Sequence, residues 1–328
     1  MEKQSVKQKI FSSLRWIGWV ILVQFILLNI SAAMYAHRFT HFYNDPSVEE
    51  TDDNPNVFKK TWRLFAGQRY AKSVVVNEPD FPVDTVHLTT KKELLIDCWY
   101  SKIDSAAKGT VILYHPLSTS KSKVAAEAEE FRNWGYNVFM IDFRAHGNSE
   151  GNNTTIGYRE AEEVKLAYDY IAAKGEKNIF LWGASMGAVA IIKAVADYKL
   201  QPRGIIAEMP FETLRTHISG RARNIGFRGF PEKPFGVLVT AWIGIERGFN
   251  GFKLKTTTYA KKVTSPVLLQ WGALDRLVEK SETDNIFEAL ASPQKKLVVY
   301  NNIDHENFLQ RDPLKWRIEV ERFLSGIR

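Results

Sequence analysis

Cysteine is nearly absent from this sequence: Cys98 is the single one among 328 residues. An internal disulfide is therefore excluded. The 45% of hydrophobic residues must fill the core of one large α/β domain, or of two small ones, without cross-links. Because Cys98 lies in the alternating stretch 93–100, we interpret it as a buried strand residue rather than a reactive thiol.

Signatures of metal and nucleic-acid binding are also missing. The sequence has no set of Cys and His with the spacing of a zinc site, so we predict no metal and no organic cofactor. The net charge of +7 comes without an RNA-binding signature or a basic helix with heptads, so we predict no nucleic-acid partner. Residues 211–262 carry ten Lys or Arg against three Asp or Glu. This stretch forms either a solvated face or a patch attracted to an anionic membrane or an acidic substrate.

Charged residues and histidine are absent from residues 16–36, WIGWVILVQFILLNISAAMYA. At 1.5 Å per residue this run spans a hydrocarbon layer of about 30 Å, so we predict a single transmembrane helix. The residues before it include Lys3, Lys7, Lys9 and Arg15, whereas residues 45–53 are acidic. This bias predicts a cytoplasmic N-terminus and an extracytoplasmic remainder. The alternatives are a signal peptide cleaved after Ala33, which predicts a secreted protein, and a buried core helix.

The domain organisation follows from this run. Residues 1–40 are predicted to form a cytoplasmic stub and the anchor, or a signal peptide. Residues 41–70 are predicted to form a linker, because residues 44–56 contain two prolines and many Asp, Asn and Glu. Residues 71–328 are predicted to form one α/β domain, and the residues below predict that it is catalytic.

Strands and helices alternate through that domain. After opening strands at 73–76, 83–89 and 93–100, we predict strands at 110–114, 137–141, 178–182, 204–207, 266–271 and 296–300, and helices at 121–134, 158–173, 186–198, 282–290 and 314–324. This order predicts a mostly parallel sheet of about eight strands, with helices on both faces and ligands beyond the carboxyl ends of the strands. Residues 211–262 interrupt the alternation and are predicted to form a small helical lid over those ends.

The sequence Gly183-Ala184-Ser185-Met186-Gly187 lies between an apolar strand and a helix rich in Ala, Val and Ile. In that context G-x-S-x-G is typical of a nucleophile elbow, a sharp turn that presents a strained serine. Side chains at positions 183 and 187 would collide with the packed strand and helix, which explains the two glycines.

Ser185 needs a base, and the base needs an orienting group, because a serine hydroxyl is a weak nucleophile at neutral pH. The order along the chain in this arrangement is Ser, acid, His. His305 follows the last strand and is the only histidine beyond Asp275, which follows the strand at 266–271. The rival acids are Asp284, Asp304 and Asp312. The first lies on a predicted helix and the second adjoins the histidine, which favours Asp275.

The tetrahedral intermediate of acyl transfer needs backbone N–H groups aimed at its oxyanion. Met186 follows the nucleophile and supplies one such group. The second is expected from the loop after the strand at 110–114, which reads His115-Pro116-Leu117-Ser118.

Together, the segments of residues 70–328 resemble the α/β-hydrolase superfamily. The runs YHPLSTS, DFRAHGNSEG, GASMG and LLQWGALD and the terminal histidine are similar to its oxyanion loop, its Asp-x-Arg-Gly-x-Gly-x-Ser segment, its elbow and its acid and base loops. The resemblance is closest to compact esterase, lipase and serine-aminopeptidase-like members. It implies that the Leu117 N–H completes the oxyanion hole. Pro116 stands where the family usually has glycine, and it restricts the backbone before Leu117.

Two further groups of residues are interpreted structurally. His115 and His146 precede the nucleophile, and we interpret both as loop anchors held by hydrogen bonds. The lid is rich in aromatic residues: Phe211, Phe227, Phe230, Phe235, Trp242, Phe249 and Phe252. Helix packing explains most of them, and we hypothesise that a few line an apolar acyl pocket.

The sequence therefore predicts a serine hydrolase that cleaves carboxylic esters, including lipid or acyl esters, through an acyl-serine intermediate. Its expected partners are a small-molecule or lipid ester and the membrane. Three alternatives use the same fold: a serine peptidase or aminopeptidase, acyl transfer to an acceptor other than water, and a catalytically idle binding module at the membrane.

Overall fold

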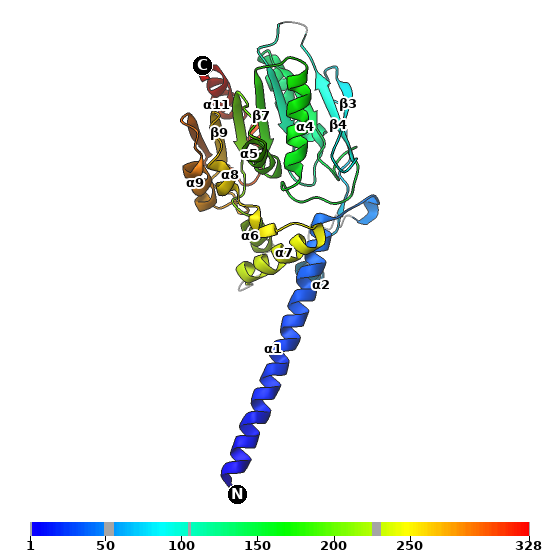
Figure 1. The fold of residues 1–328 in the computed structure, drawn as a ribbon, viewed down its shortest axis with the longest axis vertical. Coiled ribbons are helices and arrows are strands. Elements are labelled where there is room, and N and C mark those ends of the chain that lie inside the picture. The colour runs from blue at the N-terminus through cyan, green and yellow to red at the C-terminus, as the bar shows by residue number, and fades with distance from the viewer. Residues whose placement is uncertain (1, 49–55, 104–105, 225–230, 328) are drawn as a thin grey trace.

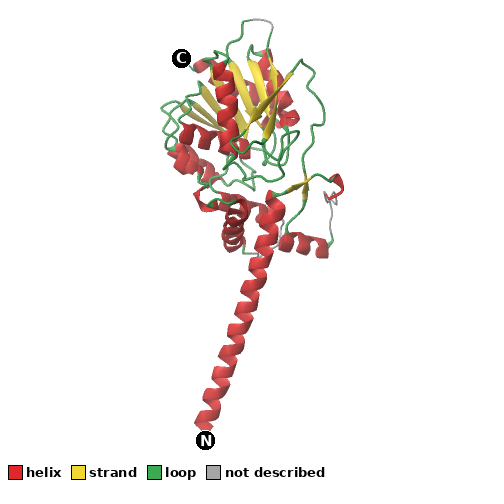
Figure 2. Cartoon of the chain, turned by 45° about the vertical axis from the view of Figure 1, so that its right-hand side comes forward, coloured by secondary structure: helices red, strands yellow, loops and turns green. Residues whose placement is uncertain are grey.

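The computed structural model describes residues 2–48, 56–103, 106–224 and 231–327. Figures 1 and 2 show a rounded α/β body from which one long helix projects, with the strands between layers of helices. The N-terminus lies at the far tip of that helix and the C-terminus at the opposite end of the body.

The body contains one sheet of eight strands in the order β10-β9-β8-β7-β5-β6-β4-β3. The strands are β3 (Asp84–Thr89), β4 (Leu95–Ser101), β5 (Thr110–Tyr114), β6 (Asn137–Ile141), β7 (Ile179–Ala184), β8 (Gly204–Glu208), β9 (Val267–Gly272) and β10 (Lys295–Tyr300). The pairs β3–β4 and β4–β6 are antiparallel, and the other neighbours are parallel. The predicted mostly parallel sheet of eight strands is confirmed.

Helices cover both faces of this sheet. One face carries α4 (Glu160–Ala173), α5 (Met186–Tyr198), α8 (Thr256–Ala260) and α9 (Lys280–Ala289). The other carries α3 (Ala125–Asn133), α10 (Phe308–Arg311) and α11 (Pro313–Gly326), with the 3-10 turn η2 (Lys121–Val124) before α3. The helices predicted from the hydrophobic pattern therefore occur where expected, with ends that differ by a few residues.

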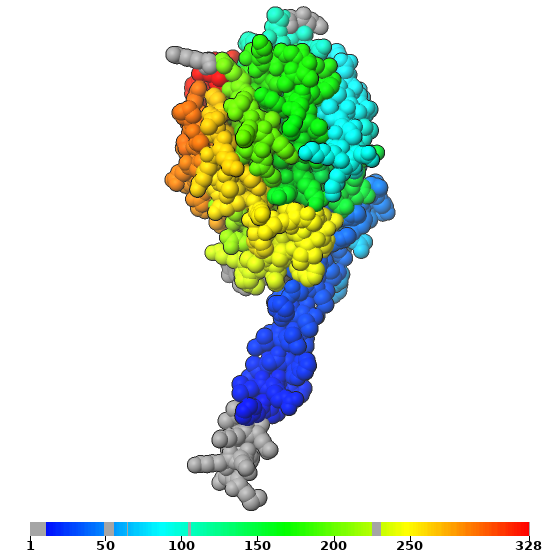
Figure 3. All heavy atoms as spheres, in the orientation of Figure 1, coloured from blue at the N-terminus to red at the C-terminus, as the bar shows by residue number. Residues whose placement is uncertain are grey.

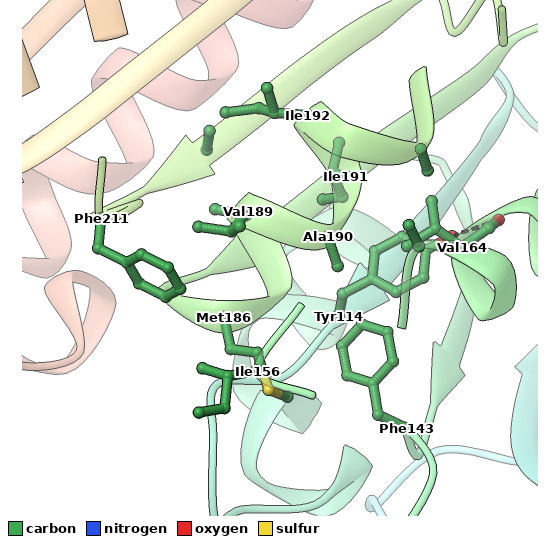
Figure 4. Packing of buried hydrophobic residues seen from close by; sticks show 14 of the residues in the cluster. Tyr114, Phe143, Ile156, Val164, Met186, Val189, Ala190, Ile191, Ile192 and Phe211 are labelled. Carbon is green, nitrogen blue, oxygen red and sulfur yellow. Dashed lines mark hydrogen bonds between the residues drawn. The ribbon is translucent and has the colours of Figure 1, made fainter. Parts of the chain in front are cut away.

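Two hydrophobic cores result from the alternation of side chains along each strand. In β7, Ile179 and Leu181 pack in the larger core with α4 and α5, whereas Phe180 and Trp182 pack in the smaller core with α3 and α11. Figure 4 shows part of the larger core, around the first turns of α5. The start of α5 is thus held rigidly between the sheet and its neighbours.

Helix α1 (Glu2–Thr40) has two parts with different surroundings. Within residues 11–30 the large apolar side chains are exposed, and this helix is long and apolar enough to cross a membrane. Beyond them, Ala32, Tyr35, Ala36 and Phe39 are buried in the larger core. Figure 3 shows the outer part as a rod that leaves the rounded body.

The predicted lid, residues 211–262, follows β8 and contains α6 (Leu214–Asn224), α7 (Glu232–Arg247), η3 (Gly251–Lys253) and α8. Its helix α7 packs against α1. Trp242 Nε1 donates a hydrogen bond to Asn29 Oδ1 (3.2 Å), and the rings of Phe235 and Tyr35 meet edge-on with centroids 5.2 Å apart. The anchor and the lid are therefore packed as one unit (Figure 1).

Residues 41–70, predicted as a linker, contain ordered elements. β1 (Phe42–Tyr43) pairs in parallel with β2 (Tyr70–Ala71), and η1 (Pro46–Val48) and α2 (Val57–Ala66) lie between them in the chain. Phe42 is fully buried, and its ring meets the His146 ring with centroids 4.8 Å apart. Residues 49–55, within the predicted linker, lie outside the described residues.

The opening strand predicted at 73–76 is wrong, since these residues form no strand. The Ser73 hydroxyl donates to the Thr119 carbonyl (2.5 Å), and the Val76 N–H donates to the Ser122 hydroxyl (3.3 Å). The segment is thus fixed by side chains and a carbonyl of a neighbouring loop, and not by the backbone ladder of a sheet.

Candidate active site

Ser185 lies at the turn between β7 and α5, with φ 50° and ψ −113°. A positive φ is strained for any residue with a Cβ, and such strain concentrates at functional sites. The Ser185 N–H donates to the Glu208 carbonyl of β8 (2.7 Å), which fixes the turn against the sheet.

The two glycines of the turn are required by close packing. A Cβ on Gly187 would lie 2.3 Å from the Tyr114 carbonyl oxygen, and one on Gly183 would lie 2.7 Å from Ile191 Cδ1. Both distances are shorter than real Cβ contacts, so the predicted steric role of these glycines is confirmed.

Ser185, His305 and Asp275 form one hydrogen-bonded chain across the carboxyl ends of β7, β9 and β10. The distance between His305 Nε2 and Ser185 Oγ is 3.0 Å, and that between His305 Nδ1 and Asp275 Oδ2 is 2.7 Å. Ser185 is 4% exposed, and the side chain of His305 is 16% exposed. The hydroxyl is therefore reachable from one side while its base is held in place.

The other oxygen of Asp275 is fixed by the backbone. Its Oδ1 accepts hydrogen bonds from the N–H groups of Leu277 and Val278, both at 2.8 Å. Gly272 allows the acid loop to approach the base loop, since a Cβ there would lie 2.4 Å from the Ile303 carbonyl oxygen. The Leu274 N–H donates to that same carbonyl (3.0 Å), so the two loops are joined directly.

The rival acids make other contacts. Asp284 pairs with Lys280 on α9, and Asp312 caps α11 by accepting from the Lys315 N–H (3.2 Å). Asp304 Oδ1 accepts from the backbone N–H groups of Arg276 and His305 rather than from the ring. In the described part of the chain, the carboxylate bonded to the imidazole is that of Asp275.

Met186 is the first residue of α5, and Leu117 lies in the loop after β5. The first N–H groups of a helix have no acceptor within the helix, and its N-terminus favours negative charge. The Pro116 carbonyl accepts from Thr119 Oγ1 (2.8 Å), and Ser118 adopts a φ of 61°. The loop on both sides of Leu117 is therefore constrained, and Pro116 faces the same cavity as Ser185.

His115 and His146 act as loop anchors, as predicted. Each ring accepts a backbone N–H at Nε2, from Phe143 (3.0 Å) and from Ser118 (3.1 Å) respectively. Each Nδ1 faces a carbonyl oxygen, at 2.7 Å and 2.8 Å, so both rings are neutral with the proton on Nδ1. Burial lowers the pKa of His115 to about 4 and that of His146 to about 3.

A cavity of about 240 Å³ opens at Ser185, and we call it the Ser185 cavity. Its apolar wall includes Val124, Trp182, Ala184 and Met209, and its polar groups include Glu208, His305 and Asn307. It extends toward the side of the sheet that carries α3 and α11, because Val124 and Trp182 belong to the smaller core.

The sequence analysis missed Glu208, which lies at the carboxyl end of β8 and lines this cavity. Its Oε1 accepts from the indole N–H groups of Trp182 (3.0 Å) and Trp316 (2.6 Å). Burial raises the pKa of Glu208 to about 8, so it is largely protonated at pH 7. Its position after a parallel strand was a usable signal, since the triad residues were found by that same rule.

The lid aromatics that the structure describes do not line the Ser185 cavity, so the hypothesis that a few of them line an acyl pocket stays a prediction. Phe211 stacks on His217 with centroids 4.5 Å apart, and Phe249 stacks on Tyr158 at the same distance. Phe235 and Trp242 contact α1, and Phe252 is exposed. The predicted Phe227 and Phe230 lie outside the described residues.

Known proteins with similar sequences and structures include hydrolases. The profile of the family described as Serine aminopeptidase, S33, matches residues 105–227. The structure of the Pyrococcus furiosus esterase Pf2001 is similar, with a TM-score of 0.64 and 27% identity, over 77% of this chain and 96% of the esterase.

Several curated proteins match in sequence, and two of them are described next. The uncharacterized protein YqkD of Bacillus subtilis is 24% identical over 66% of this chain and 72% of its own length. The lysophosphatidylserine lipase ABHD12 of Xenopus tropicalis is 21% identical over 62% of this chain, and the match spans 52% of that lipase. The likeness to the lipase thus covers about half of its length.

Proposed function

Since this chain belongs to the α/β-hydrolase superfamily, we propose that it is a serine hydrolase that cleaves carboxylic esters. The observation that carries the proposal is the chain of hydrogen bonds from Ser185 through His305 to Asp275, at a strained turn that opens into a cavity. A serine hydroxyl in this arrangement can be deprotonated as it attacks a carbonyl carbon.

In the proposed reaction, His305 Nε2 takes the proton of Ser185 Oγ while that oxygen bonds to the ester carbonyl carbon. The N–H groups of Met186 and Leu117 stabilise the oxyanion, and Asp275 stabilises the imidazolium. The bond from carbon to the alkoxy oxygen then breaks, and the leaving alcohol takes the proton from His305. Water then attacks the carbonyl carbon of the acyl-serine while His305 Nε2 takes a proton from it. The bond from that carbon to Ser185 Oγ breaks, Oγ takes the proton back from His305, and the carboxylic acid is released.

The charge of the Ser185 cavity favours an ester over a peptide with a free N-terminus. An α-ammonium group needs an available carboxylate, but Glu208 is largely neutral at pH 7 and Glu306 pairs with Arg311 (2.6 Å). Lys123, which also lines the Ser185 cavity, adds a positive charge that would repel an ammonium group. A short or medium acyl chain suits the apolar part of a cavity of about 240 Å³.

We further propose that α1 is a retained transmembrane anchor, with the N-terminus in the cytoplasm and the catalytic domain outside it. The hydrogen bond and the burial of residues next to Ala33, the alternative site of signal-peptide cleavage, support the view that α1 is retained. Ser31 Oγ donates to the Phe65 carbonyl (2.5 Å), and Ala32 is fully buried within a continuous helix. Removal of residues 1–33 would take away contacts that hold α2 and α7. The proposed division is therefore an anchor, a short packed connection, and a catalytic domain with its lid.

Hydrolysis of two substrate series by the purified full chain tests the function. We expect turnover of p-nitrophenyl acyl esters and little turnover of aminoacyl p-nitroanilides. Ser185→Ala should lower ester turnover by about 10³-fold or more, whereas Ser325→Ala, at an exposed serine on α11, serves as the matched control. Equal ester turnover by Ser185→Ala and the wild type would refute the proposal, and faster turnover of the anilides would assign the site to peptides.

A further inference from the structure

A second cavity, of about 320 Å³, lies where the buried part of α1 meets α2, β2 and α6, and we call it the anchor cavity. Its walls include Tyr35 of α1, Lys60 and Arg63 of α2, Tyr70 of β2, Arg221 of α6, and Leu277. In the part of the chain that the structure describes, no residue lines both this cavity and the Ser185 cavity. The proposed reaction therefore leaves the anchor cavity without a role.

Among the described residues, the charged side chains that line the anchor cavity have one sign. Three of its eight lining side chains, those of Lys60, Arg63 and Arg221, are cations, and none of the eight is a carboxylate. Tyrosine hydroxyls and an asparagine amide are among the other polar groups of the wall. A concave site with several cations and hydrogen-bond donors favours an anion with several oxygens.

Arg221 is held in a fixed position for such an anion. Its Nη2 donates to the Tyr70 hydroxyl (2.6 Å), and its guanidinium carbon lies 4.7 Å from the centroid of the Phe39 ring. Both contacts orient the planar guanidinium without neutralising it. A pre-oriented guanidinium binds phosphate through paired N–H groups, at a lower entropic cost than a mobile lysine.

The position of the cavity along α1 indicates where the anion comes from. The large apolar side chains of α1 are exposed up to Ile30, and the protein covers the helix beyond it, so we place the edge of the hydrocarbon layer at Ile30 rather than at the end of the charge-free run, residue 36. Tyr35 lies five residues further on, hence about 7 Å beyond the edge of that layer. Phosphate groups of a bilayer lie at this depth, because the headgroup layers add about 5–7 Å on each side.

Helix α2 provides an independent indication of the same depth. Its Val57 and Phe58 are 74% and 79% exposed, and Trp62 is 43% exposed, although α2 also contributes Lys60 and Arg63 to the cavity. A helix that exposes apolar side chains next to cations is typical of the membrane interface. The apolar side chains of α2 are thus suited to the acyl boundary while its cations reach the phosphates.

We propose that the anchor cavity binds the phosphate of a phospholipid headgroup. The lipid belongs to the membrane leaflet that faces the catalytic domain. The choice of a lipid over a soluble phosphate ester rests on the proposed membrane anchor. Binding holds α1, α2 and α6 together around one anion. It also reaches the acid loop, since Leu277 lines the cavity and its N–H donates to Asp275 Oδ1.

Native mass spectrometry of the full chain in detergent tests this proposal. The Ser185→Ala variant is used throughout, so that turnover neither consumes the probe nor affects the result. The probes are dioleoylphosphatidylglycerol, diolein, which has the same acyl chains without phosphate, and glycerol 3-phosphate, which has no acyl chain. We expect one tightly bound phosphatidylglycerol per chain and much weaker binding of the other two.

Variants of the cavity wall localise the site. Lys60→Gln and Arg221→Gln should each weaken phosphatidylglycerol binding by about tenfold, the effect of losing one charge-assisted hydrogen bond. Lys59→Gln, on the same helix but outside the cavity wall, is the matched control and should bind as before. Lys60 is exposed, so its replacement leaves the fold intact and carries the test even if Arg221→Gln unfolds.

Three results would overturn the proposal. Equal binding of diolein would show that the phosphate is not recognised. Equal losses in Lys59→Gln and Lys60→Gln would show attraction to general surface charge. Binding of glycerol 3-phosphate as tight as that of the lipid would assign the cavity to a soluble phosphate ester.

Discussion

The Ser185 cavity and the anchor cavity differ in the segments of the chain that form them and in the charge of their walls. The first lies at the carboxyl ends of parallel strands, and its buried carboxyl, Glu208, is largely neutral. The second is built from α1, α2, β2 and the lid, and its wall is cationic. In this molecule the sheet positions the proposed chemistry, whereas the segments around the anchor form a surface suited to the membrane interface. The two are joined through Leu277, which lines the anchor cavity and donates to Asp275 Oδ1, so changes that leave this hydrogen bond in place should affect one cavity and not the other.

Asp275→Asn is expected to have the largest effect on this comparison. The amide cannot stabilise the imidazolium and favours the wrong tautomer of His305, so ester turnover should fall by roughly 10³–10⁴-fold. Binding of phosphatidylglycerol in the anchor cavity should stay the same, because the amide oxygen of the variant can still accept the Leu277 N–H and so keep Leu277 in that wall. Steady-state kinetics and native mass spectrometry check the two halves. Near-normal turnover would mean that the acid is a different residue.

Val124→Phe sharpens the description of the Ser185 cavity. Val124 is 2% exposed and lines the cavity, so a larger side chain should shorten the space for the acyl chain. We expect kcat/KM for octanoyl esters to fall by about tenfold relative to that for acetyl esters. In an apolar pocket, the fit of a single methylene group changes kcat/KM by about tenfold or more. Val124→Ala is the matched variant and should shift the preference toward longer chains. A uniform change across the series in both variants would place the acyl chain elsewhere.

Glu208→Gln tests the neutral carboxyl behind the nucleophile. Burial raises the folded pKa of Glu208 to about 8, above its ordinary value of 4.5, so the folded chain binds a proton that the unfolded chain has lost. Stability should fall as pH rises from about 5 to 8, by at most about 1.4 kcal/mol per pH unit from this group. In Glu208→Gln, Tm should depend less on pH over this range. An unchanged slope would mean that Glu208 is ionised in the folded protein.

Trp242→Ala should have the smallest effect on substrate choice. Trp242 contacts Asn29 of α1 and does not line the Ser185 cavity, so the preference among acyl esters should match that of the wild type. A loss of selectivity between acetyl and octanoyl esters in this variant would connect the lid to the acyl site after all.

The residues that sequence reasoning located best are those that follow strands. Ser185, Asp275 and His305 lie far apart in the chain, but the carboxyl ends of parallel strands meet at one edge, so their meeting could be predicted. Glu208 obeys the same rule and was missed because no motif surrounds it. Its elevated pKa depends on burial against Trp182 and Trp316, which only the tertiary packing reveals.

The parts that the sequence did not predict lie near the anchor. Phe42 is buried against His146, about one hundred residues further along the chain. The lid aromatics looked suited to an acyl pocket by composition, but Phe235 and Trp242 pack on α1. Such contacts join segments that are far apart in the sequence, and no periodic pattern marks them. Composition alone does not specify which residue an apolar side chain packs against.

Labelling with a fluorophosphonate probe tests the central claim most directly, because this reagent phosphonylates an activated serine. The full chain in its membranes is treated with the probe, and the labelled peptide is then identified by mass spectrometry. We predict that the label is on Ser185, that the labelled protein stays in the membrane fraction, and that His305→Ala abolishes labelling. Labelling of another serine, or undiminished labelling of Ser185→Ala, would contradict the account of this site.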